Sequence, residues 1–392
     1  MKPGIYDTLS NAEYHGGPGE SKSLLDLVRR SPAHYAAAKD PANDNEDTST
    51  PAQMIGTAFH ALLLEPKEFA KDYCLALRRE DVPEAIDDRE QLVAMVQELN
   101  AGRLAKLPTG GTKAEQIERI IAANAEMGID ASQSVEALNA AKGAELKAEL
   151  ERINAGRQGL LPISGNRHEL AEILRANGRQ ITLWSDVMAE WQANNGHRTV
   201  LSQDQWDQLH NMRDAVMAHP AASALLTGAP GVAERSVYWR DPVTGLLCRC
   251  RPDFWREDGI IVDVKTTDNA SAEEFARSIA NWRYHVQHPF YMDGINLMRD
   301  QAGVECKPIK AFLFLAVEKS ARVVNGVALG VAVYVLDNES VELGRIEARQ
   351  DMERIAECKR TGVWPGYGDK IQPLSLPQWK LARNADLLAQ AV

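Results

Sequence analysis

The chain has 392 residues, of which 44% are hydrophobic and 25% are charged; these values are ordinary for a globular protein and exclude wholesale disorder. The net charge of −11 does not exclude a nucleic-acid partner, because the local arrangement of charge decides whether a polyanion binds. Without a membrane-length apolar run or an apolar leader, and with five scattered cysteines, the sequence predicts a cytoplasmic protein with neither membrane contact nor a disulfide framework.

Residues 1–84 are predicted to be mostly helical and to form the N-terminal part of the main domain. The apolar periodicity after Ser21 predicts one helix, and the proline after Ser31 begins a second. The apolar segment 54–64 predicts a third helix, which carries His60. A single histidine on such a helix is usually a core residue, whereas a neutral imidazole near carboxylates would bind a metal.

Residues 85–182 are rich in Ala, Glu, Lys and Arg and predict a helical insertion that contains a repeat. Identical residues recur at an offset of 54, namely Asn100–Arg103 with Asn154–Arg157, Leu107 and Pro108 with Leu161 and Pro162, and Gly111 with Gly165. A capping-box signature follows each copy, Thr112 with Glu115 and Asn166 with Glu169. Each repeat is therefore predicted as a helix, an extended connection and a second helix.

Residues 183–392 change to a mixed pattern, so the predicted fold class is α/β (α+β), with a mixed central sheet flanked by helices. Helices are expected at 202–218, 271–282, 283–298 and 340–360, and strands at 234–239, 247–254, 260–265, 309–317 and 327–336. Turn-forming Asp, Pro and Gly residues separate the first three strands, which predicts an antiparallel three-stranded meander.

The sharpest chemical signal is Pro252-Asp253, followed after nine residues by Asp263-Val264-Lys265. Alternation along a strand places Asp263 and Lys265 on one face, and a hairpin would bring Asp253 beside them. Such charges are unfavourable to bury without a function. Carboxylate oxygens suit Mg²⁺, and a lysine can orient or activate water. The same spacing is common in solvated hairpins, but the apolar run 260–262 indicates a buried strand here.

Further side chains are candidates for contact with nucleic acid. Gln287 and Tyr291 are four residues apart on a predicted helix and share a face. Tyr284 could stack on a base, whereas Trp282 is expected in the core. Arg251 could follow a phosphate backbone, although a single arginine is more commonly an ordinary surface charge.

The insertion offers a second candidate surface for nucleic acid. Lys113 and Arg167 each lie at a predicted helix start, where free backbone N–H groups and a cation together would cradle a phosphate. The insertion carries slightly more acids than bases, so a helical arm for protein contacts or assembly remains an alternative.

Together these residues resemble the PD-(D/E)XK nuclease superfamily, and within it the RecB-like and RecE-like (exodeoxyribonuclease VIII type) exonucleases of phages and prophages. The matching pieces are Gly56-x-x-x-His60, Glu234, Pro252-Asp253, Asp263-x-Lys265 and Gln287-x-x-x-Tyr291, in the order of the family. The resemblance covers roughly residues 5–80 and 185–380. It implies a restriction-endonuclease-like core, while the repeats of the insertion resemble SAP or helix-extension-helix motifs.

The resemblance also implies an activity and a set of roles. The activity would be Mg²⁺-dependent hydrolysis of duplex DNA from its ends in the 5′ to 3′ direction, in phage-type recombination, with Mn²⁺ able to substitute. Asp253, Asp263, Lys265 and Glu234 would be catalytic; His60, Asp253, Asp263 and the Val264 carbonyl would hold the metal; Gln287 and Tyr291 would hold the DNA strand.

The expected partners follow from the same resemblance: double-stranded DNA ends, further copies of the chain in a ring-like tetramer, and a single-strand annealing protein. The clustered cysteines of iron–sulfur relatives are missing from the sequence, so no such cluster is expected. Two alternatives remain open, a structure-selective endonuclease and a DNA-binding scaffold with a vestigial nuclease site.

Overall fold

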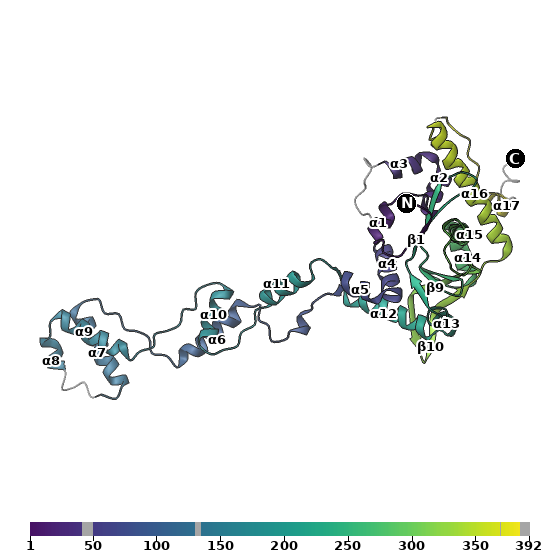
Figure 1. Cartoon of the computed structure of the whole chain (residues 1–392). Helices are drawn as coiled ribbons and strands as arrows, with labels where there is room; N and C mark the ends of the chain where they lie inside the picture. Colours follow the sequence, from purple (N-terminus) through teal and green to yellow (C-terminus); the bar gives the residue numbers. More distant parts are fainter. Residues whose placement is uncertain (41–49, 130–134, 369, 385–392) are drawn as a thin grey trace. The chain divides into compact units, whose positions relative to one another are not determined.

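The computed structural model describes residues 1–40, 50–129, 135–368 and 370–384. The chain divides into two compact units, Met1–Tyr73 with Leu201–Val392, and Cys74–Val200 (Figure 1). It passes from one unit to the other through β2 (Tyr73–Leu75) and β3 (Thr199–Leu201), which pair with each other. The predicted limits of the insertion, 85 and 182, lie inside the second unit.

The first unit contains most of the strands. Its helices are α1 (Asn11–Gly16), α2 (Lys22–Arg30), α3 (Pro32–Lys39), α4 (Pro51–Leu64), α5 (Pro66–Asp72), α12 (Gln203–Ala218), α13 (Pro220–Thr227), α14 (Ala272–Asn281), α15 (Tyr284–Ala302), α16 (Asn338–Thr361) and α17 (Gln378–Arg383). Its strands are β1 (Gly4–Tyr6), β4 (Gly231–Ala233), β5 (Ser236–Arg240), β6 (Leu247–Cys250), β7 (Phe254–Arg256), β8 (Ile260–Thr267), β9 (Ala311–Val324) and β10 (Val327–Tyr334).

A mixed five-stranded sheet with the order β10-β9-β8-β7-β4 forms the centre of this unit, and β1, β5 and β6 form a separate antiparallel sheet. In the larger sheet β8 and β9 are parallel and the other neighbours are antiparallel. Residues of α4 and α12 pack in the core on one face of the sheet, and residues of α14, α15 and α16 pack in the core on the other. This architecture confirms the predicted mixed sheet flanked by helices.

The predicted three-stranded meander is wrong, because β6 and β7 belong to different sheets. The strand predicted over 247–254 is interrupted at Pro252, which has no backbone N–H to donate to a ladder. The neighbouring strand is interrupted at the same level, between β4 and β5, where Glu234 has a left-handed φ of 50°. The Glu234 N–H donates to the Asp253 carbonyl at 3.1 Å, so the two interruptions lie side by side.

The second unit is helical. It comprises a short 3₁₀ helix at Arg79–Asp81 and helices α6 (Arg89–Ala101), α7 (Lys113–Glu126), α8 (Val135–Ala140), α9 (Gly143–Ala155), α10 (Arg167–Ala176) and α11 (Trp184–Asn195). Both predicted capping boxes are present, at the starts of α7 and α10. Across the described parts of the whole chain, no helix combines the length and the apolar character needed to cross a membrane.

The two repeats of this unit exchange helices. Helix α6 packs against α10 and α7 packs against α9, so each pair takes one helix from each repeat (Figure 1). Each pair has its own apolar core. Leu92 of α6 and Leu146 of α9 occupy equivalent positions in the repeats, and both are buried. Neither repeat therefore folds around itself.

Equivalent hydrogen bonds join the last turn of a helix in each repeat to the extended connection of the other repeat. The Asn100 side chain donates to the Leu161 carbonyl at 3.0 Å and accepts from the Leu161 N–H at 2.7 Å. The Asn154 side chain makes the same pair of bonds with Leu107, at 2.9 and 2.8 Å. The repeated Asn and Leu residues seen in the sequence are thus partners across repeats, not within one.

Candidate functional site

The candidate site lies along β8, beyond the point where its partner β7 ends. The last paired residues are Phe254 of β7 and Val262 of β8, so the next N–H group on that edge of β8 lacks a strand partner. Asp253 fills this place: its Oδ2 accepts from the Val264 N–H at 2.7 Å. The interruption at Pro252 thereby fixes one carboxylate against β8.

Asp263 and Lys265 extend from the same face of β8, as the alternation predicted. Asp263 Oδ2 lies 2.5 Å from Lys265 Nζ, and the Asp263 side chain is completely buried. From α15, Gln287 Nε2 donates to Asp263 Oδ1 at 2.6 Å. Both oxygens of this carboxylate therefore have defined partners within the site.

His60 reaches the site from α4, far upstream in the chain. A Cβ atom at Gly56 would lie 3.3 Å from Thr266 Oγ1 on β8, so the glycine permits a close approach of helix and strand. One turn later, His60 Nδ1 lies 3.6 Å from Asp253 Oδ2. The structure therefore brings together the imidazole, the two aspartates and the lysine that the sequence analysis selected.

Glu234 completes a set of possible metal ligands. Ligand atoms of His60, Glu234 and Asp253 all lie within 4.8 Å of one another. A left-handed conformation at a non-glycine residue is strained, and such strain is concentrated at functional sites. One imidazole nitrogen and two carboxylate oxygens suit a divalent cation such as Mg²⁺ or Mn²⁺. Glu234, expected among the catalytic residues, is thus grouped with His60 and Asp253, while Asp263 forms an ion pair with Lys265 and accepts a hydrogen bond from Gln287.

Burial raises the pKa of each of the three carboxyl groups of the site above its ordinary value. Burial, followed by the charge of Asp253, raises the pKa of Glu234 to about 8. Burial is also the main reason that the pKa of Asp263 is raised to about 6, against the opposing effect of Lys265. Burial raises the pKa of Asp253 as well. Crowded, buried carboxylates of this kind are stabilised by a bound cation.

The two basic side chains of the site have opposite protonation tendencies. Burial, followed by the charge of Lys265, lowers the pKa of His60 to about 4, so the imidazole is neutral and has a lone pair for a metal. Burial opposes the charged form of Lys265, but Asp263 and Asp253 outweigh it and raise the pKa of Lys265 above its ordinary value. Lys265 is therefore a hydrogen-bond donor and a fixed positive charge.

An aromatic ring and a second lysine adjoin Lys265. The ring centroid of Tyr284 lies 4.7 Å from Lys265 Nζ and 5.6 Å from Lys22 Nζ. Lys22 is the first residue of α2 and also pairs with Asp26 at 2.7 Å. Sequence reasoning missed Lys22, because it belongs to no motif and only the fold brings α2 to the site.

Two predicted DNA contacts are engaged inside the protein. Arg251 is buried, donates to Ser236 Oγ at 2.6 Å and lies 4.3 Å from the Tyr14 ring centroid, so it holds the N-terminal segment. Tyr291 packs beside Phe312 in the core on the α15 face, with ring centroids 6.1 Å apart. The Arg251 guanidinium is therefore engaged by the protein itself, whereas Tyr291 has only its ring packed in the core and stays a predicted DNA contact.

The predicted phosphate cradles of the insertion are also occupied by the protein itself. Lys113 Nζ donates to the Asn139 carbonyl at 2.7 Å, and Arg167 pairs with Asp87 at 2.5 Å. The capping carboxylates of Glu115 and Glu169 accept from the N–H groups at the two helix starts. These helix starts therefore present negative side chains rather than an open anion site.

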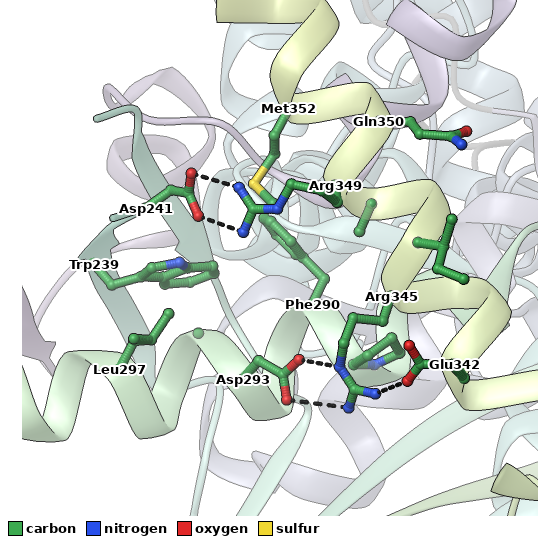
Figure 2. Close-up of a pocket in the computed structure, with 14 residues that line it drawn as sticks. Trp239, Asp241, Phe290, Asp293, Leu297, Glu342, Arg345, Arg349, Gln350 and Met352 are labelled. Carbon is green, nitrogen blue, oxygen red and sulfur yellow. Dashed lines mark hydrogen bonds and ion pairs between the residues drawn. The ribbon is translucent and has the colours of Figure 1, made fainter. Parts of the chain in front are cut away.

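A cavity of about 440 Å³ lies elsewhere, between β5, α15 and α16 (Figure 2). Trp239, Phe290, Leu297 and Met352 contribute apolar surface to it, and none of the candidate catalytic residues lines it. Its two arginines are already paired, Arg349 with Asp241, and Arg345 with Asp293 and Glu342 (Figure 2). The cavity is therefore separate from the charged site on β8.

Comparison with known proteins identifies the family. The family model described as "PDDEXK-like domain of unknown function (DUF3799)" matches residues 182–377, half of the chain. Among solved structures, a protein from Eubacterium rectale described as a putative exonuclease shares 12% sequence identity, covering 60% of this chain and 85% of its own, with a TM-score of 0.31. No curated protein matches the chain significantly. The chain belongs to the family of PDDEXK-like domains of unknown function.

Proposed function

We propose that the protein is a metal-dependent deoxyribonuclease that hydrolyses duplex DNA from its ends. Membership of a PDDEXK-like family supports a nuclease in general. The observation that carries the proposal is the convergence on one edge of β8 of five side chains from α4, the β4–β5 connection, the β6–β7 connection and β8 itself, namely His60, Glu234, Asp253, Asp263 and Lys265. The preference for ends rests on the resemblance of the motifs to RecE-type exonucleases.

The donor set fits a divalent cation. His60, Glu234 and Asp253 would hold it, and Asp263 and the Val264 carbonyl are further candidate ligands. Mg²⁺ is the expected ion, and Mn²⁺ could replace it. When bound, such an ion acts as a Lewis acid on the phosphoryl group and lowers the pKa of water.

The protein's own residues supply the remaining chemistry. The Lys265 ammonium orients the attacking water and stabilises the negative charge that develops on the phosphate. Its raised pKa makes this role fit better than removal of the proton from water. Gln287 fixes the Asp263 carboxylate, and the face of the Tyr284 ring holds the lysine in place. Tyr284 is thus proposed as a positioning residue in place of its predicted role in stacking.

The biological setting that we propose also follows from the RecE-type resemblance. The enzyme would degrade one strand in the 5′ to 3′ direction during phage-type recombination, act as a homo-oligomer such as a ring-like tetramer, and pass its product to a single-strand annealing protein. The insertion would contact DNA or mediate assembly.

Linear and covalently closed circular duplexes, incubated with the purified protein and Mg²⁺, test the proposal. Linear DNA should be degraded, with 5′ label released before 3′ label, while circles stay intact. Asp263→Asn should abolish degradation, whereas Asp214→Asn, at an exposed carboxylate on α12, should not. Nicking of circles would instead identify an endonuclease. DNA binding without turnover under all metal conditions would identify a scaffold.

A further inference from the structure

Trp282 has a position that its sequence context did not predict. It was expected in the core, but its side chain is 65% exposed, so that prediction is wrong. Of the tryptophans whose side chains the structure describes, it alone is exposed. An indole in water leaves a large apolar surface unburied, which marks it as a candidate contact for a partner.

The backbone that carries this indole is held firmly on both sides. Trp282 follows the end of α14, where its N–H donates to the Ser278 carbonyl at 2.9 Å. Its own carbonyl accepts from Lys22 Nζ at 2.5 Å. The exposed side chain is therefore attached to a backbone that hydrogen bonds restrain on both sides.

The next residue, Arg283, further restrains the backbone at Trp282. Arg283 has a left-handed φ of 53°, and its guanidinium pairs with Asp26, Glu347 and Asp351 at 2.9, 3.0 and 2.6 Å. These acids belong to α2 and α16, so one strained residue ties three helices together. Strain that the surrounding contacts maintain in this way is typical of functional sites.

The backbone at Trp282 is also connected, through Lys22 and Tyr284, to the proposed catalytic residue Lys265. Lys22, which holds the Trp282 carbonyl, lies 5.6 Å from the Tyr284 ring centroid, and Lys265 lies 4.7 Å from the same centroid. Lys22 thus links the Trp282 backbone to Tyr284, and the Tyr284 ring in turn contacts the Lys265 ammonium. Trp282 is exposed to solvent, whereas Tyr284 contacts Lys265, so the two aromatic residues are placed for different functions.

We propose that Trp282 is a stacking platform for a base of the DNA strand whose phosphodiester bond is being cut. An aromatic face stacks on any base, so the contact would hold the strand without selecting its sequence, as a processive nuclease requires. This inference rests on the proposed function and adds the residue that grips the substrate beside the Lys265 centre.

Paired kinetic measurements on short duplexes with a single-stranded tail test the proposal. Trp282→Ala should raise KM by about 5- to 150-fold, which corresponds to the 1–3 kcal/mol of one stacked base, and should leave kcat within about twofold. Trp282→Phe should restore most of the affinity. Tyr284→Leu should show the opposite split, with a lower kcat and little change in KM.

Abasic substrates make the test specific for stacking. In Ca²⁺, without turnover, binding by the wild-type protein should weaken when one particular nucleotide of the tail lacks its base, and Trp282→Ala should be insensitive at that position. Equal sensitivity of both proteins at every position would overturn the proposal. An unchanged KM together with a changed molar mass in light scattering would also overturn it and assign Trp282 to a protein interface.

Loss of wild-type cleavage on plain DNA would instead contradict the nuclease function, because the abasic binding comparison does not depend on turnover.

Discussion

The two units of this protein obtain their order in different ways. In the first unit, residues far apart in the sequence meet on one sheet: His60 comes from α4, Asp253 from the β6–β7 connection and Lys265 from β8. In the second unit, two similar repeats supply the helix pairs α6–α10 and α7–α9, and each pair takes one helix from each repeat. A change in the first unit should therefore affect chemistry, and a change in the second should affect cooperative folding.

The largest expected effect is a loss of turnover that a substitution in the first unit causes and a matched substitution in the second unit does not. Lys265→Ala should reduce turnover by about 10²- to 10⁴-fold, because it removes a fixed charge next to the reacting phosphate. Binding of metal and of DNA should persist. Lys147→Ala, an exposed lysine on α9 of the second unit, is the matched control and should leave turnover unchanged. Single-turnover rates of the two variants measure this difference in turnover. An active Lys265→Ala enzyme would contradict a role for the lysine in the mechanism.

Tyr284 should have a smaller effect of the same kind. Loss of the ring face in Tyr284→Leu removes a cation–π contact of about 0.5–2 kcal/mol, equal to about 2- to 30-fold in kcat. Tyr284→Phe keeps the ring and should keep the rate. If both variants lose activity equally, the hydroxyl rather than the ring face would be the important group.

The raised carboxyl pKa values predict a pH dependence of metal binding. The pKa values of Asp263 and Glu234 are raised to about 6 and about 8, so a cation must displace protons near neutral pH. Mg²⁺ affinity should rise between pH 6 and pH 8, by up to about tenfold per pH unit for each proton displaced. Calorimetry in buffers of different ionisation enthalpy counts the protons, and Glu234→Gln should flatten the upper part of this window.

The raised pKa values of Asp263 and Glu234 also make the stability of the metal-free protein depend on pH. Both folded-state pKa values exceed the ordinary values, so the folded state binds protons more tightly than the unfolded state does. Their contribution to stability is complete at low pH and is lost as pH rises through about 6 and then about 8. Without metal, the unfolding temperature of the first unit should fall over this range. A rise instead would contradict the described burial of these groups.

The smallest expected effects test the exchange of helices. Asn100→Ala and Asn154→Ala each leave a leucine N–H and carbonyl without their partners, which should destabilise the second unit by about 1–3 kcal/mol. Because the two sites are equivalent, the two losses should match within error and leave nuclease kcat unchanged. Urea unfolding followed by circular dichroism measures both. Strongly unequal losses would show that the repeats are not equivalent partners.

The sequence predicted the residues of the site better than their surroundings. Alternation along a buried strand was enough to place Asp263 and Lys265 together, and motif spacing selected Asp253 and His60. Spacing alone did not reveal that Pro252 would divide a strand between two sheets, since that break depends on the second sheet.

Long-range packing explains the other differences. The repeat was visible in the sequence, but whether Asn100 bonds within its own repeat or across to Leu161 depends on which helices share a core. Lys22 and Trp282 carry no motif, and the hydrogen bond that joins them follows only from how α2 meets the start of α15. Local patterns predicted the elements, and tertiary contacts determined which of them are neighbours.

Anomalous scattering from a crystal soaked in Mn²⁺ tests directly whether the site on β8 binds a divalent cation. We expect a peak at about 2.2 Å from oxygens of Asp253 and Glu234 and from a nitrogen of His60, with loss of the peak in Asp253→Asn. An ordered first unit with intact side chains and no peak at this position, at a Mn²⁺ concentration that supports cleavage, would contradict it.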